Sequence, residues 1–282
     1  MTDVRTPDAP AATEENQAAL NQTGGFIWYE LMTPDAEAAK AFYESVVGWS
    51  VGEAAPDFKG YRMIGRSDGG FAGGLLPFDD HMKQHGVRPG WLGYIHVSDV
   101  DETVASIERD GGKTWMAATD IPNVGRIALV TDPQSAPFYV MTPIPPANDP
   151  NAQSDVFSTD QPQHIRWNEL SSSDQDGAVD FYQRHFGWVQ EGAMPMGEMG
   201  DYRFIYFNGT RIGAIMRKPP QLPVSMWSFY IGVDDIDRAA DALRNGGGQI
   251  LHGPQEIPGG EYSLNAMDPQ GAAFGLVGPR KS

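Results

Sequence analysis

The sequence of 282 residues contains no cysteine, which excludes disulfides, thiol nucleophiles and zinc sites built on thiolates. No stretch approaches the ~18 apolar residues of a membrane span, and residues 1–23 contain no signal-peptide core. Basic residues number 20 against 37 acidic ones, so the net charge of −17 repels nucleic-acid phosphates and anionic lipids. We therefore expect a cytoplasmic protein, monomeric or homodimeric, with no nucleic-acid or membrane partner.

The residues that are present indicate a folded chain of many short elements. The hydrophobic fraction of 40% suits a globular core. The 33 glycines and 22 prolines indicate many turns. The length corresponds to about two domains of roughly 150 residues each.

Two segments of the chain are repeated. The run FIWYELMTPDAEAAKAFYESVVGWSV matches IRWNELSSSDQDGAVDFYQRHFGWVQ without a gap, with Trp28 aligned to Trp167 at an offset of 139. The run GWLGYIHVSDVDETVASIERDGGKTW matches MWSFYIGVDDIDRAADALRNGGGQIL, with Trp91 aligned to Trp227 at an offset of 136. The chain therefore has the order A-B-A′-B′, in which an internal repeat predicts a repeated fold unit.

Each repeat begins with a β-rich run that ends in aspartate. Asp35, Asp99, Asp174 and Asp235 stand where a helix should start, so each is a candidate N-cap. A helical spacing of apolar residues follows, and further strand-like runs close the unit. The pattern predicts an α+β fold of tandem paired β-α-β-β-β units that form two open eight-stranded barrels.

The composition also predicts the domain boundaries. The stretch from Thr142 to Gln163 is polar and rich in proline, which is typical of a linker. We expect a disordered N-terminal tail at residues 1–23 and a first domain at residues 24–145. A linker at residues 146–161 should then lead to a second domain at residues 162–282.

These motifs resemble those of the vicinal oxygen chelate (VOC) superfamily, which includes glyoxalase I, extradiol dioxygenases and bleomycin-resistance proteins. The resemblance covers residues 24–145 and 162–280. It rests on the strand-Asp-helix openings, the VSDVD and VDDID runs, the FY…GW helix ends and the DPQ turns. The chain is most similar to two-domain glyoxalase-like members, some of which are labelled hydroxylases. The resemblance implies that each pair of units surrounds a small-molecule site.

The metal ligands of that superfamily are missing. The resemblance implies ligands seven residues before the opening Asp and seven residues after the Asp of the closing turn. Those positions here hold Trp28, Leu92, Tyr139, Trp167, Ser228 and Gly275, which are poor ligands for a divalent ion. We therefore predict no bound metal and no other cofactor.

Strand alternation assigns side chains to the predicted cavities. In the first half the candidate catalytic residues are Glu30, Tyr94, His96 and Tyr139, and the candidate substrate-binding residues are Trp28, Met32, Leu92 and Met141. In the second half the candidate binding residues are Trp167, Glu169, Ser228 and Tyr230. This lining is aromatic and apolar with a few polar groups, as is typical of small-molecule pockets.

Each polar candidate has a structural interpretation beside the functional one. Glu30 and Glu169 could act as general bases whose pKa is raised by burial, or they could fasten the sheets by hydrogen bonds. Tyr94 and Tyr230 could contact a ligand or be core residues with bonded hydroxyls. His96 has no counterpart in the second half, where Gly232 replaces it, and it is the proton-transfer candidate of the first.

The leading hypothesis is a two-domain protein that binds a small apolar or aromatic molecule. Under this hypothesis the protein could also transform the bound molecule by acid–base chemistry without a metal. Two alternatives remain open: a metal-dependent lyase or dioxygenase with non-standard ligands, and a non-catalytic binding or resistance module. Glycine at the positions of His96 and Tyr139 predicts a roomier second cavity, so we expect any chemistry in the first half.

Overall fold

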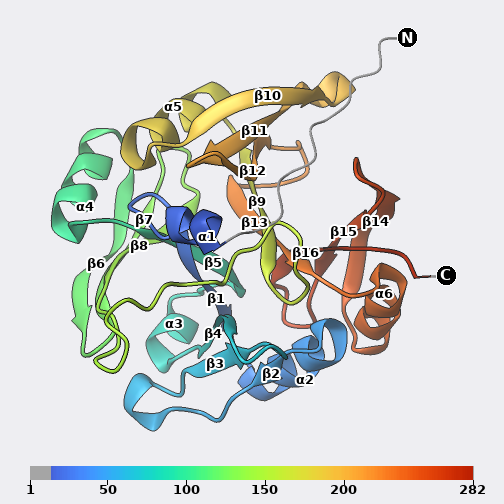
Figure 1. The fold of residues 1–282 in the computed structure, drawn as a ribbon, viewed down its shortest axis with the longest axis horizontal. Helices are drawn as coiled ribbons and strands as arrows, with labels where there is room; N and C mark the ends of the chain where they lie inside the picture. Colours follow the sequence, from blue (N-terminus) through green and yellow to red (C-terminus); the bar gives the residue numbers. More distant parts are fainter. Residues whose placement is uncertain (1–13, 282) are drawn as a thin grey trace.

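The computed structural model describes residues 14–281, and the first part of the predicted tail, residues 1–13, lies outside them. Each half of the chain forms one open, curved, eight-stranded mixed sheet with helices on one face (Figure 1). The strand orders are β2-β3-β4-β1-β5-β8-β7-β6 and β10-β11-β12-β9-β13-β16-β15-β14. The two orders are equivalent, which confirms the predicted tandem of paired units.

The first half comprises α1 (Glu14–Leu20), β1 (Phe26–Thr33), α2 (Ala36–Val47), β2 (Ser50–Val51), β3 (Arg62–Gly65), β4 (Phe71–Pro77), α3 (Asp80–Gln84), β5 (Gly90–His96), α4 (Val100–Arg109), β6 (Lys113–Ile121), β7 (Gly125–Thr131) and β8 (Pro137–Pro143). The second comprises β9 (Ile165–Ser172), α5 (Gln175–Phe186), β10 (Val189–Pro195), β11 (Asp201–Phe207), β12 (Thr210–Arg217), β13 (Met226–Gly232), α6 (Ile236–Asn245), β14 (Gln249–Glu256), β15 (Tyr262–Met267) and β16 (Ala273–Gly278). Within the described residues, no helix is long and apolar enough to cross a membrane.

The four predicted capping aspartates each begin a helix. Asp35, Asp99, Asp174 and Asp235 have extended backbones, and each carboxylate accepts a hydrogen bond from a backbone N–H of the first helical turn. Such caps satisfy donors that have no partner inside the helix. Gly48 ends α2 in the left-handed conformation, with φ of 83°, as the sequence predicts.

The helices pack on strands of their own half and also against helices of the other half. Helix α2 of the first half lies against α6 of the second, and α4 lies against α5 (Figure 1). The repeated motifs make equivalent contacts across this interface. The Tyr43 hydroxyl donates to Asp268 Oδ2 at 3.1 Å, and the Tyr182 hydroxyl donates to Asp132 Oδ2 at 3.3 Å. The FY and DPQ motifs therefore join the two halves.

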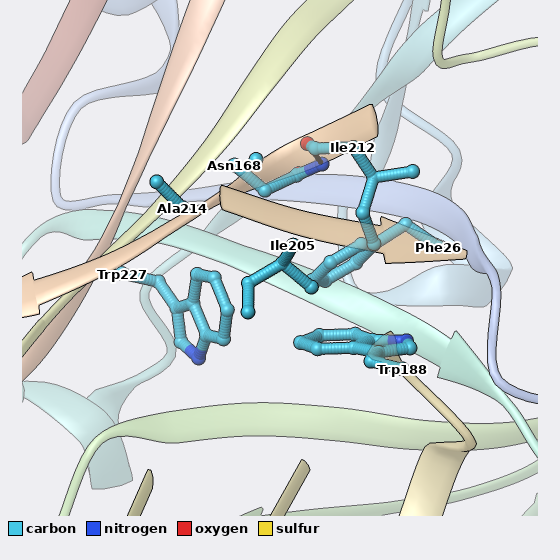
Figure 2. A pocket seen from close by; sticks show the side chains of 8 residues that line it. Phe26, Asn168, Trp188, Ile205, Ile212, Ala214 and Trp227 are labelled. Atoms are coloured by element: carbon cyan, nitrogen blue, oxygen red, sulfur yellow. Dashed lines mark hydrogen bonds between the residues drawn. The ribbon is translucent and has the colours of Figure 1, made fainter. Parts of the chain in front are cut away.

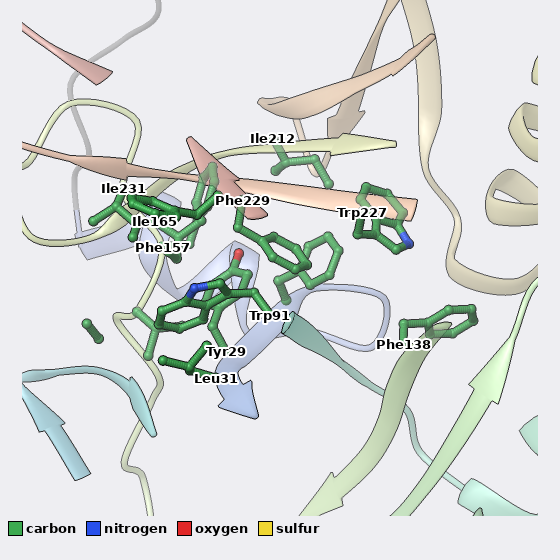
Figure 3. Packing of buried hydrophobic residues seen from close by; sticks show 14 of the residues in the cluster. Tyr29, Leu31, Trp91, Phe138, Phe157, Ile165, Ile212, Trp227, Phe229 and Ile231 are labelled. Atoms are coloured by element: carbon green, nitrogen blue, oxygen red, sulfur yellow. The ribbon is translucent and has the colours of Figure 1, made fainter. Parts of the chain in front are cut away.

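Side chains from both halves share one core. A single buried cluster contains Tyr29 and Trp91 from the first half together with Trp227 and Phe229 from the second (Figure 3). At its centre the Tyr29 hydroxyl donates to Asn168 Oδ1 at 2.8 Å, and these two residues are equivalent in the repeat. The second face of each sheet, which we call the inner face, points away from this core and from the helices, and it carries Glu30 and Glu169.

We expect Tyr43→Phe to lower the free energy of unfolding by about 1–3 kcal/mol. The Tyr43 hydroxyl accepts from Trp91 Nε1 at 3.0 Å and donates to Asp268, so its removal leaves two buried polar groups unpaired. Urea denaturation measures the change. Tyr206→Phe is the matched control, because no hydroxyl bond of half-buried Tyr206 is found among the described residues. Equal losses in both variants would contradict the proposed fastening role.

The predicted tail and linker are partly ordered against each other. Residues 14–20 form α1, which differs from the expected disorder there. Gln17 Nε2 and Asn21 Nδ2 both donate to the Ser154 carbonyl, at 2.8 and 2.7 Å. The linker is packed as well, since Phe157 is only 3% exposed.

Candidate functional site

Glu30 lies in the middle of the inner face of the first sheet. Its strand neighbours Tyr29 and Leu31 enter the shared core, whereas Glu30 points to the opposite side and is 3% exposed. The Tyr94 hydroxyl, from adjacent β5, donates to Glu30 Oε2 at 2.9 Å. Parallel pairing of β5 with β8 places the Tyr139 ring 4.2 Å from that of Tyr94. The structure thus brings three of the four predicted catalytic residues together.

The carboxyl of Glu30 is poised to gain or lose a proton near neutral pH. Burial raises the pKa of Glu30 to about 7, and the hydroxyls of Tyr94 and Tyr139 lower it in part. One oxygen, Oε2, is bound to Tyr94, while Oε1 is buried and has no hydrogen-bond partner among the described residues. A buried acceptor without a protein partner is able to accept a hydrogen bond from a ligand or a water molecule.

The sequence analysis missed Tyr61, which completes this cluster. The Tyr61 hydroxyl accepts from Trp28 Nε1 at 2.7 Å. The neighbouring strand gives it room, because a Cβ on Gly74 would lie 1.9 Å from that hydroxyl oxygen. The pair Tyr61-Arg62 corresponds to Tyr202-Arg203 in the second half, and this repeated pair is the signal in the sequence that could have indicated Tyr61.

The predicted binding residues of the first half surround this polar centre with apolar side chains. Met32 and Met141 are buried, at 6% and 9% exposure, and Trp28 and Leu92 are half-buried. Leu92 pairs directly with Glu30 across the two strands. The inner face therefore presents apolar and aromatic groups above a single buried carboxyl.

His96 does not belong to this cluster. Glu30 pairs with Leu92, so His96 lies four residues further along β5, about 13 Å away at ~3.3 Å per residue. Its Nδ1 makes a hydrogen bond with the Asn21 carbonyl at 2.8 Å, beyond the end of α1. Strand alternation places His96 on the same face as Glu30, but the separation of four residues along β5 keeps the two side chains apart.

The second half contains an equivalent Trp–Tyr–Glu–Tyr cluster. Trp167 Nε1 donates to the Tyr202 hydroxyl at 2.6 Å, and that hydroxyl donates to Glu169 Oε2 at 2.6 Å. The Tyr230 hydroxyl lies 3.3 Å from both Glu169 oxygens and accepts from Asn265 Nδ2 at 2.8 Å. Burial raises the pKa of Glu169, and its tyrosine partners oppose this. Both oxygens of Glu169 are therefore engaged, unlike those of Glu30.

The two glycines expected to enlarge the second cavity do not leave empty space. A Cβ on Gly275 would lie 2.3 Å from the Tyr230 ring, which covers that position. A Cβ on Gly232 would lie 2.6 Å from the Arg166 side chain. At both points a neighbouring side chain occupies the position of the missing one.

The superfamily's metal positions do not suit a metal ion. The indole N–H of Trp28 is a donor already bound to Tyr61, and burial raises the pKa of the Tyr139 hydroxyl, so it stays protonated. Leu92 offers no ligand atom. In the part of the chain that the structure describes, no group of three His, Asp or Glu residues could hold an ion.

Two spaces found among the described residues lie away from Glu30. A small gap among Phe26, Trp188 and Trp227 in the shared core has no room for a water molecule (Figure 2). A surface hollow of about 450 Å³ lies where α5 begins, beside Asp174 and Arg217. Asp174 caps α5 there, so its carboxylate has a structural role. Neither space includes a predicted catalytic residue.

Comparison with known proteins identifies the fold unit. The family model "Glyoxalase/Bleomycin resistance protein/Dioxygenase superfamily" matches residues 25–136 and 161–276, one match to each half. The chain belongs to this superfamily. The match also confirms the resemblance inferred from the repeated motifs.

Relatives of this superfamily member span nearly its whole length. "Putative glyoxylase CFP32" of Mycobacterium tuberculosis (strain CDC 1551 / Oshkosh) is 30% identical over 96% of this chain and 98% of the relative. "Anthracycline biosynthesis protein DauV" of Streptomyces sp. (strain C5) is 26% identical over 92% of this chain and 94% of the relative. The solved Mn(II)-bound glyoxalase from Novosphingobium aromaticivorans has the same fold, with a TM-score of 0.60, 20% identity, and coverage of 92% of this chain and 83% of that one.

Proposed function

We propose that the N-terminal half of this superfamily member binds a small apolar or aromatic molecule over Glu30, and that Glu30 exchanges a proton with it without a metal. One observation carries this proposal: Glu30 is buried, has a pKa of about 7, and keeps one carboxyl oxygen without a partner. A general acid or base works best when its pKa lies near the working pH.

The surrounding residues support the roles within this proposal. Tyr94 holds Oε2, which leaves Oε1 to take a proton from the ligand or to return one. Trp28, Leu92 and Met141 supply apolar contacts for a ring. A relative named for anthracycline biosynthesis is compatible with an aromatic ligand. As a base, the Glu30 carboxylate takes the proton and becomes a carboxylic acid. This acid exchanges its proton with solvent water, returns a proton to the same carbon and is again a carboxylate, so no other reactant is consumed.

The test compares two equivalent variants, Glu30→Gln and Glu169→Gln. Aromatic ketones incubated with the protein in D₂O report proton exchange at the carbon beside the carbonyl, followed by NMR. We expect Glu30→Gln to slow the exchange by about 100-fold or more, because general acid–base catalysis contributes at least that factor. Glu169→Gln should retain most of the rate, since Glu169 has no free oxygen.

Three outcomes contradict the proposal. Loss of stability in both variants without a specific defect in exchange would show that both glutamates are fasteners. Loss of activity on chelation, with about one ion per domain by elemental analysis, would indicate a metal-dependent enzyme. Ligand binding without any exchange would indicate a non-catalytic binding module.

A further inference from the structure

We propose that the inner face of the C-terminal sheet is a second ligand site, which binds a neutral, multiply hydroxylated ring such as a monosaccharide or cyclic polyol. The site differs from the Glu30 site in chemistry and does not depend on catalysis there. The repeat reveals the difference, because equivalent positions can be compared directly. Four apolar positions of the first inner face, Met32, Leu92, Ile127 and Leu129, correspond to Ser171, Ser228, Ser263 and Asn265 in the second.

These four polar residues face the same side as Glu169. On β13, Trp227 and Phe229 enter the shared core, so Ser228 points to the inner face. On β15, Leu264 and Ala266 enter the core, which places Ser263 and Asn265 on the inner face too. The substitutions therefore change one continuous surface from apolar to hydrogen-bonding.

Most of the polar groups on this face are free to bind a ligand. Among the described residues, no side-chain hydrogen bond is found for Ser171, Ser228 or Ser263, although Ser171 is only 4% exposed. Asn265 uses its amide N–H for the Tyr230 hydroxyl at 2.8 Å, which leaves its carbonyl oxygen. Serine hydroxyls both donate and accept, so together these groups match a ligand with several hydroxyls.

A flat aromatic surface lies beside these hydroxyls. The Trp167 ring is half-buried and lies parallel to Tyr202, with centroids 6.3 Å apart and an angle of 8°. Its Nε1 bond to Tyr202 and the edge of Phe204 hold it in place. The Arg211 guanidinium lies over the same ring, 5.8 Å from its centroid, so a ligand would contact the part of the indole that Arg211 and Tyr202 leave exposed. Aromatic surface with a few convergent polar groups is the usual composition of a small-molecule site.

The charged groups beside this face are Glu169, Arg166 and Arg211, and the Arg211 guanidinium is held over the Trp167 and Phe204 rings, 5.8 and 5.0 Å from their centroids. Glu169 accepts from Tyr202 and Tyr230, so its oxygens are engaged and it would repel an anion. Arg166 is neutralised by Glu261, with Nη2 and Oε2 2.8 Å apart, and also donates to the Thr159 carbonyl. The net charge of −17 further disfavours an anion.

The experiment titrates the full-length chain with glucose, mannose and myo-inositol, using saturation-transfer NMR, with glucuronate and naphthalene as comparison probes. We expect at least one neutral polyol to bind. We expect the double variant Ser263→Ala with Asn265→Ala to weaken that binding about tenfold, because two hydrogen bonds contribute about 1–3 kcal/mol together. Leu129→Ala, at the position equivalent to Asn265, is the matched control and should leave polyol binding unchanged. Melting curves confirm that each variant is folded.

Several results would overturn this second site: no polyol binding, tighter binding of glucuronate or naphthalene at the same face, or equal effects of the double variant and Leu129→Ala. If the double variant fails to fold, Ser228→Ala alone serves in its place and should weaken polyol binding several-fold. Glu30→Gln tests the proposed proton exchange separately, so failure of one proposal does not imply failure of the other.

Discussion

Replacing Trp188 with alanine is expected to lower the free energy of unfolding by about 3–5 kcal/mol, the usual cost of deleting a fully buried tryptophan. Trp188 is 1% exposed in the core that the halves share. Its ring stacks on Tyr182 with centroids 4.9 Å apart, and it lies 5.4 Å from Phe26 of the other half. Its Nε1 donates to the Gly24 carbonyl at 2.7 Å. The substitution therefore creates a cavity and leaves a backbone carbonyl unpaired.

Urea denaturation monitored by circular dichroism measures this loss. Trp115→Ala is the matched control, because Trp115 is 58% exposed on edge strand β6 and its removal should cost under about 0.5 kcal/mol. We expect Trp188→Ala to unfold in a single transition at lower urea, since the core joins both halves. Two separate transitions in the wild type, with only the second altered, would contradict a shared core.

Much of the fold could be predicted from the sequence because repeated segments with the same pattern of residues form the same structural unit. The gap-free alignment predicts equal units, and the aspartate before each apolar helical pattern predicts where the helix begins. The partners of each unit could not be predicted in this way. Tyr43 and Asp268 lie in different halves, and no local pattern indicates that α2 of one half packs on α6 of the other.

The residues of the candidate site could be predicted only where strand alternation determines which face of the sheet a side chain lies on. Alternation assigns Glu30, Tyr94 and Tyr139 to one face, and pairing of neighbouring strands brings them into contact. Tyr61 comes from just before β3, at the far side of β4, so its contact with Trp28 depends on register. His96 shows the opposite error, because a shared face does not imply a shared neighbourhood.

Two buried acids are expected to make a contribution to the free energy of unfolding of the wild-type protein that falls as pH rises from about 4 to about 7. Burial raises the pKa of Glu30 from 4.5 to about 7 and that of Asp132 from 3.8 to about 6. An acid whose pKa is higher in the folded state binds its proton more tightly there. Its stabilising effect is therefore complete below the unfolded pKa and is lost as pH rises through the folded pKa.

Each of these two acids is expected to contribute roughly 3 kcal/mol to the decline, at ~1.4 kcal/mol per pKa unit. The windows differ: about pH 4.5 to 7 for Glu30, and about pH 4 to 6 for Asp132. Burial lowers the pKa of His164 and of His185, and these histidines add stability as pH rises. The difference between the wild type and a variant is consequently more informative than either curve alone.

Urea denaturation at pH 4.5, 5.5, 6.5 and 7.5 tests this with Glu30→Gln and Asp132→Asn. Glutamine does not ionise, so Glu30→Gln should gain stability relative to the wild type as pH rises, by about 3 kcal/mol between the ends of this range. Asp132→Asn should show its gain mainly below pH 6.5, because Asp132 titrates earlier. A constant difference between Glu30→Gln and the wild type at all four pH values would mean that Glu30 ionises at its ordinary pKa. The carboxyl would then be a poor acid at neutral pH, and the proton exchange proposed for the first half would lose its physical basis.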